Sequence, residues 1–118
     1  MEENKDDLFD TDILRGAYER HRSLRGFTTI LNVIEFPKAL EFEDVNVLEP
    51  TSEEYALALE LCVKLLQRGT PVPAVDIVIA ALGIRRELRL RTNDPHFSTI
   101  RAVAPEMTLK TGGGLKSN

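Results

Sequence analysis

The chain has 118 residues, of which 42% are hydrophobic and 29% charged, the composition of one ordinary globular domain. Its longest apolar run, residues 77–82, is too short for the roughly 18 residues of a membrane-spanning helix, and residues 1–12 are too acidic for a signal peptide. The single cysteine, Cys62, excludes an intrachain disulfide and fits a reducing compartment, so we expect a cytoplasmic protein. With 15 basic and 19 acidic residues, charge alone does not identify a nucleic-acid-binding protein.

The first half of the chain alternates short apolar runs with segments of helical spacing. Its β-branched and apolar runs predict strands at residues 8–9, 27–33 and 45–48. The spacing of apolar residues predicts helices at residues 13–24, closed by Gly26, and at residues 34–40, where Pro37 falls in the first turn.

The second half begins with the clearest local signal. Thr51 and Glu54 have the spacing of a capping box, which predicts a helix over residues 52–68 that Gly69 closes. This helix is apolar over more than one stripe, so we expect it to be largely buried, with a second copy of the chain or a partner protein covering part of it. Further along we predict a helix at 74–88, a strand at 88–91, a turn of helix at 95–100, a strand at 107–110 and a disordered tail at 111–118.

Strands that alternate with helices predict an α/β fold, here a three-layer α/β/α sandwich with a mostly parallel central sheet, in a single domain over residues 1–110. Parallel sheets bind ligands beyond the carboxyl ends of their strands, near the point where the strand order reverses. Asp10, Glu35 and Asp94 each follow a predicted strand, which is the first physical indication of a site.

Each acid has an ordinary explanation when it is taken alone. The dipole of its helix favours Asp76 in the first turn, and Asp94 is an expected turn residue. A solvated helix start accounts for Glu35, and an acidic N-terminal segment accounts for Asp10 and Asp12. The two histidines and the cysteine lack the spacing of a zinc site.

Taken together, the acids follow a known order. Residues 70–97, TPVPAVDIVIAALGIRRELRLRTNDPHF, are similar to the PIN-domain toxins of VapBC-type toxin–antitoxin pairs, in which the third acid opens a helix of the form D-x-x-I-A-A. A strand, T-x-D and then Phe follow in that family, and this chain matches them with Thr92, Asp94, His96 and Phe97. The resemblance makes Asp10 the first acid and Glu35 the second, with a shortened N-terminal part between them.

The resemblance implies a Mg²⁺- or Mn²⁺-dependent endoribonuclease with an RNA substrate, a cognate antitoxin and a homodimeric state. It implies that the catalytic and metal-binding residues are Asp10, Glu35, Asp76 and Asp94, supported by Thr92 and Asn93. Carboxylate oxygens suit both ions, and converging carboxylates repel one another without a cation. The candidates to hold RNA phosphates, unless they form a plain solvated face, are Arg85, Arg86, Arg89 and Arg91. The alternative is a catalytically degenerate PIN-like module that binds RNA or a protein partner, and convergence of the acids distinguishes the two.

Overall fold

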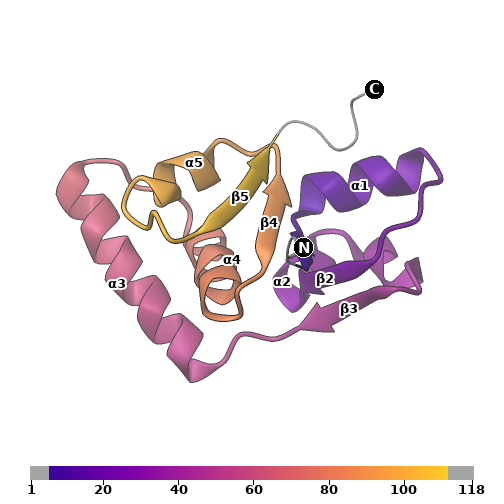
Figure 1. The fold of residues 1–118 in the computed structure, drawn as a ribbon, viewed down its shortest axis with the longest axis horizontal. Helices are drawn as coiled ribbons and strands as arrows, with labels where there is room; N and C mark the ends of the chain where they lie inside the picture. Colours follow the sequence, from indigo (N-terminus) through magenta and orange to yellow (C-terminus); the bar gives the residue numbers. More distant parts are fainter. Residues whose placement is uncertain (1–5, 112–118) are drawn as a thin grey trace, which may run out of the picture.

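Five short strands form one sheet at the centre of the molecule (Figure 1). The computed structural model describes residues 6–111. The strands are β1 (Asp7–Phe9), β2 (Gly26–Thr29), β3 (Val45–Leu48), β4 (Arg89–Thr92) and β5 (Thr108–Thr111). Their order is β3-β2-β1-β4-β5, and every neighbouring pair is parallel. The shortest strand, β1, is therefore the central one.

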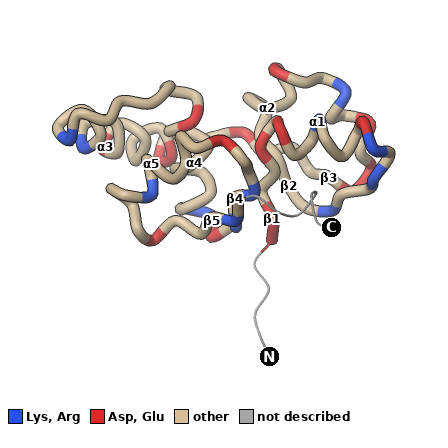
Figure 2. Tube along the Cα trace, turned by 90° about the horizontal axis from the view of Figure 1, so that it is seen from above, with Lys and Arg blue, Asp and Glu red and all other residues tan. Residues whose placement is uncertain are grey.

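Helices cover both faces of this sheet. They are α1 (Thr11–Glu19), α2 (Ile30–Glu35), the 3₁₀ helix η1 (Pro37–Glu41), α3 (Ser52–Arg68), α4 (Ala74–Arg85) and α5 (His96–Arg101). Successive side chains of a strand point to opposite faces, so the buried Leu8 packs with α3, α4 and α5 while the buried Phe9 packs with α1, α2 and η1. Figure 2 shows these two groups of helices on opposite sides of the molecule. The predicted three-layer α/β/α architecture is confirmed.

The predicted strand at 27–33 is wrong in its second half. Strand β2 ends at Thr29, and α2 begins at Ile30 although its sequence is rich in β-branched residues. The hydroxyl of Thr29 accepts a hydrogen bond from the Asn32 backbone N–H at 3.2 Å, and together they form a capping box that starts the helix. Glu35 is therefore the last residue of α2 and not the start of a helix. The predicted helix at 34–40 is divided between the end of α2 and the 3₁₀ helix η1.

The first helix is shorter than predicted, because α1 ends at Glu19 and His21 has a positive φ of 55°. Gly26 does not close this helix but begins β2. At its φ of 152° a Cβ atom would lie 2.6 Å from the carbonyl oxygen of Asp7. Only glycine lets β1 and β2 approach this closely.

Helix α3 has the predicted bounds, the predicted capping box and a left-handed Gly69 at its end. Leu61 and Leu65 are buried against the core. The expectation that the helix is largely buried is wrong within the single chain, because Leu59 and Leu66 are 66% and 60% exposed. We call the exposed apolar side chains Tyr55, Leu59, Val63 and Leu66 the α3 stripe.

At the carboxyl end, β5 includes Thr111, one residue of the predicted tail, whereas the rest of that tail, residues 112–118, lies outside the described residues. Between residues 6 and 111 no helix has the length and hydrophobicity that a membrane span requires.

Candidate functional site

The strand order reverses between β1 and β4. From β1 the chain builds β2 and β3 on one side of the sheet, and it then returns to add β4 and β5 on the other. Such a switch point leaves a crevice beyond the carboxyl ends of the two strands. Asp10 directly follows β1, Thr92 ends β4, and the Thr92 hydroxyl donates a hydrogen bond to Asp10 Oδ2 at 2.6 Å. Figure 2 shows acidic positions gathered in this region, between the two groups of helices.

Asp10 is a buried carboxyl group, 7% exposed. Its Oδ1 accepts a hydrogen bond from the Asn32 side-chain amide at 3.1 Å. Burial raises the pKa of Asp10 to about 6 against the lowering effect of its hydrogen bonds, and the charges of Asp12 and Asp76 raise it further. The ionised form of Asp10 is therefore held at a cost in free energy that a bound cation would remove.

Asp76 and Asp94 meet at a histidine. Asp76 lies in the first turn of α4, Asp94 lies in the loop after β4, and His96 begins α5. The His96 Nδ1 atom lies 2.9 Å from Asp76 Oδ2 and 3.2 Å from Asp94 Oδ1. One ligand atom from each of the three residues falls within 4.8 Å of the others.

The pKa of Asp76 links this group to the remaining acids. Burial raises it first, the hydrogen bond with His96 lowers it, and the negative charges of Asp94 and Glu35 raise it. Because Asp76 also raises the pKa of Asp10, it interacts electrostatically with all three of the other predicted acids. The structure thus brings Asp10, Glu35, Asp76 and Asp94 to one region, although Glu35 is exposed.

A chain of hydrogen bonds orients Glu35 and Asp10 relative to each other. The Thr11 hydroxyl donates to Glu35 Oε1 at 2.6 Å and accepts from the Asn32 amide at 3.0 Å. The same Asn32 amide donates to Asp10, and Asn32 is fully buried. Thr11 and Asn32 were not predicted as site residues, although a buried asparagine inside an apolar run was a signal for one.

Asp12 is a further site residue that the sequence analysis did not assign. Its Oδ2 accepts a hydrogen bond from the backbone N–H of Asn93 at 2.8 Å. Its Oδ1 is buried without a hydrogen-bond partner among the described residues. A buried oxygen of this kind, beside converging carboxylates, is an environment that suits a cation.

The predicted RNA-contacting arginines have other surroundings. Arg86 forms a two-pronged ion pair with the buried Glu54, with its Nε atom 2.7 Å from Oε2. Arg89 and Arg91 both pair with Asp7 of β1. Arg85 is exposed in the last turn of α4, at the opposite end of that helix from Asp76. The RNA-binding role of these four arginines stays a prediction.

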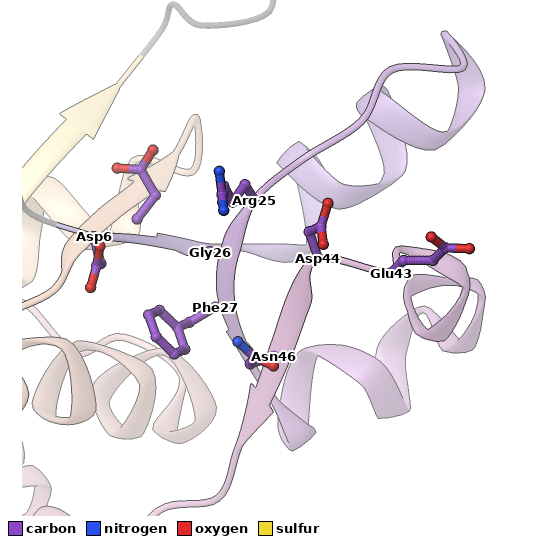
Figure 3. Close-up of a pocket in the computed structure, with 8 residues that line it drawn as sticks. Asp6, Arg25, Gly26, Phe27, Glu43, Asp44 and Asn46 are labelled. Atoms are coloured by element: carbon purple, nitrogen blue, oxygen red, sulfur yellow. The ribbon is translucent and has the colours of Figure 1, made fainter.

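A separate cavity of about 410 Å³ lies at the amino edge of the sheet, where the strands begin (Figure 3). Its lining includes Asp6, Arg25, Glu43 and Asp44. The residues that line it do not include Asp10, Glu35, Asp76 or Asp94, which lie beyond the opposite ends of the strands. This cavity is not part of the candidate site.

No family model and no curated protein matches the sequence. Solved structures do match the fold. VapBC2 from Rickettsia felis, bound to a DNA fragment from their promoter, has a chain that aligns with a TM-score of 0.72 at 16% identity, over 89% of this chain and 97% of that one. VapBC-5 from Mycobacterium tuberculosis aligns with a TM-score of 0.70 at 19% identity, over 90% and 98%. DNA-bound VapBC from Salmonella typhimurium aligns with a TM-score of 0.67 at 18% identity, over 92% and 98%.

The chain has a PIN-domain fold. The resemblance to VapC-like PIN proteins is thereby confirmed at the level of the fold. The short strand β1 occupies the central position of the sheet despite the predicted shortening of the N-terminal part.

Proposed function

We propose that this PIN-fold protein is a divalent-metal-dependent endoribonuclease, the toxin of a VapBC-type pair. The observation that carries the proposal is the convergence of Asp10, Glu35, Asp76 and Asp94 at the switch point of the sheet. Beyond the larger effect of burial, the charge of Asp76 raises the pKa of Asp10, and the charges of Asp94 and Glu35 raise the pKa of Asp76, so acids from four separate segments of the chain act on one another.

The described residues fit a hard divalent cation, Mg²⁺ or Mn²⁺. Asp10, Asp76 and Asp94 would hold it, with Glu35 at the exposed margin where RNA arrives. A divalent ion there supplies a water molecule of lowered pKa and positive charge beside a phosphodiester. The chain's own contribution is orientation: Thr92 and Asn32 fix the two oxygens of Asp10, and Thr11 fixes Glu35.

The proposed partners are an antitoxin and a second copy of the chain. The matched structures are toxin–antitoxin complexes, which supports an antitoxin for this chain. The α3 stripe supports a homodimer, because its side chains are between 45% and 66% exposed along one helix face, and apolar patches of this kind mark interaction surfaces.

The test is cleavage of a defined single-stranded RNA by the purified, untagged chain, freed of any partner. We expect fragments with Mg²⁺ or Mn²⁺, none with EDTA, and none from Asp76→Asn. A matched control is Asp44→Asn, which also removes one negative charge but at an exposed position just before β3. This control should cleave like the wild type.

Two results would contradict the proposal. Equal cleavage by Asp76→Asn would assign the activity to a contaminating nuclease. Intact RNA after incubation with the metal-loaded wild type would favour the degenerate module, which binds RNA or a protein partner without cutting.

A further inference from the structure

His96 is placed at the candidate metal centre by the same turn that holds Asp94. Its backbone N–H, at the start of α5, donates to Asp94 Oδ1 at 2.9 Å. The turn leaves the imidazole ring facing two carboxylates that come from different elements, the loop after β4 and the first turn of α4.

The spacing of these atoms matches neighbouring ligands of one metal ion. Two ligands at about 2.1 Å from an ion, at a right angle to each other, lie roughly 3.0 Å apart. The Nδ1 atom of His96 lies 2.9 Å from Asp76 Oδ2 and 3.2 Å from Asp94 Oδ1. One ligand atom from each of the three residues lies within 4.8 Å of the others.

We infer that His96 Nδ1 is a metal ligand at this centre and that it makes the centre prefer transition-metal ions over Mg²⁺. The inference rests on the metal centre of the proposed function and adds a nitrogen donor to its carboxylates. Mg²⁺ binds oxygen ligands and keeps several waters, so an imidazole adds little to its affinity. Imidazole suits the later first-row ions, and affinity at such a site rises from Mn²⁺ towards Co²⁺ and Ni²⁺.

The test compares the affinities of Co²⁺ and Mg²⁺ for the untagged chain, measured by calorimetry and by the visible absorption of Co²⁺. The variant is His96→Asn, since asparagine keeps a hydrogen-bonding group near the position of Nδ1 and removes the imidazole ligand. The control is His21→Asn, which alters the only other histidine. His21 is exposed at a positive φ that asparagine tolerates.

We expect the Kd for Co²⁺ to rise at least about tenfold in His96→Asn, since loss of even an outer-shell partner costs roughly ten- to hundredfold. The Kd for Mg²⁺ should change much less, and His21→Asn should leave both unchanged. If His96 is only a hydrogen-bonding partner that orients the two carboxylates, the Kd values for Co²⁺ and Mg²⁺ rise by a similar factor. That result, or an unchanged Co²⁺ affinity, would overturn the inference.

A second measurement uses the folded wild type and needs no variant. With two histidines in the chain, imidazole nitrogen spectra resolve His96 from His21. Zn²⁺, which is diamagnetic and suits imidazole, should shift the His96 Nδ1 signal strongly and leave the signals of His21 unchanged, and an unperturbed His96 at saturating metal refutes the ligand assignment. RNA cleavage is scored separately. Metal binding that depends on His96 Nδ1 but is not accompanied by cleavage would contradict the proposed function alone. Cleavage with Mg²⁺ without ligation by His96 would contradict this inference alone.

Discussion

Replacing Asp10 by asparagine should make the metal-free protein more stable at alkaline pH. Asp10 is 7% exposed, and burial raises its pKa from 3.8 to about 6. The folded state therefore binds this proton more tightly than the unfolded state, so stability is highest when the group is protonated and falls as pH rises from about 4 through about 6. At about 1.4 kcal/mol for each tenfold change in proton affinity, the full loss in the wild type is about 3 kcal/mol.

Asp10→Asn removes this pH-dependent loss of stability and keeps most of the hydrogen bonds around residue 10. The amide oxygen can still accept from Asn32, while the Thr92 hydroxyl loses its acceptor, at a cost of about 1–2 kcal/mol that does not depend on pH. The informative quantity is therefore the difference in unfolding free energy between wild type and variant, measured by urea denaturation in EDTA. It should move by about 2 kcal/mol in favour of the variant between pH 4.5 and pH 8.

Asp44→Asn serves as the control, because it removes the same charge from an exposed position. The reasoning is refuted if the difference in unfolding free energy between the wild type and Asp10→Asn is equal at both pH values. That result would mean that Asp10 titrates alike in the folded and unfolded states. A pH dependence of the opposite sign would mean that the carboxylate form is stabilised, as in a centre that retains a cation.

The other predictions concern the metal, one buried ion pair and the α3 stripe. Mg²⁺ or Mn²⁺ at a hundredfold excess over Kd should stabilise the wild type by about 2.7 kcal/mol in thermal unfolding and Asp76→Asn by far less; equal shifts contradict the metal site. Arg86→Met should lower the free energy of unfolding, measured with urea, by about 3 kcal/mol or more, because it leaves Glu54, 2% exposed, without its charged partner. A change below about 1 kcal/mol contradicts this prediction. Leu59→Glu should convert a dimer to a monomer in light scattering, whereas Leu40→Glu, at an equally exposed 66% on η1, should not; a wild type that is monomeric at high concentration excludes the homodimer.

The parts of the fold that follow local rules could be predicted from the sequence. The capping box of Thr51 and Glu54 and the left-handed Gly69 fix the bounds of α3 through contacts within a few residues. The alternation of strand and helix gave the α/β class, and the order of Asp76, Thr92 and Asp94 along the chain indicated the PIN fold. These features depend on neighbours in sequence, which a pattern records directly.

Other features depend on partners far along the chain, and the local sequence pattern does not predict them. The run of residues 30–33 favours a strand by composition, yet the buried Asn32 caps α2 and reaches Asp10 and Thr11. Arg89 and Arg91 pair with Asp7, more than 80 positions away. Nothing in the local pattern of either arginine indicates that partner. The contact of His96 with Asp76 likewise becomes visible only when α5 brings it to the first turn of α4.

The central position of β1 sets the order in which a newly synthesised chain can fold. One neighbour of β1, strand β2, leaves the ribosome soon after it, but the other, β4, begins only at Arg89. Until then the middle of the sheet has an open edge, and pairings over so long a separation close slowly. Thr92, Asp94 and His96 arrive with that late segment. Translation must therefore pass β4 and the start of α5 before the acids can meet, so a nascent or truncated chain that ends before Arg89 carries no assembled centre.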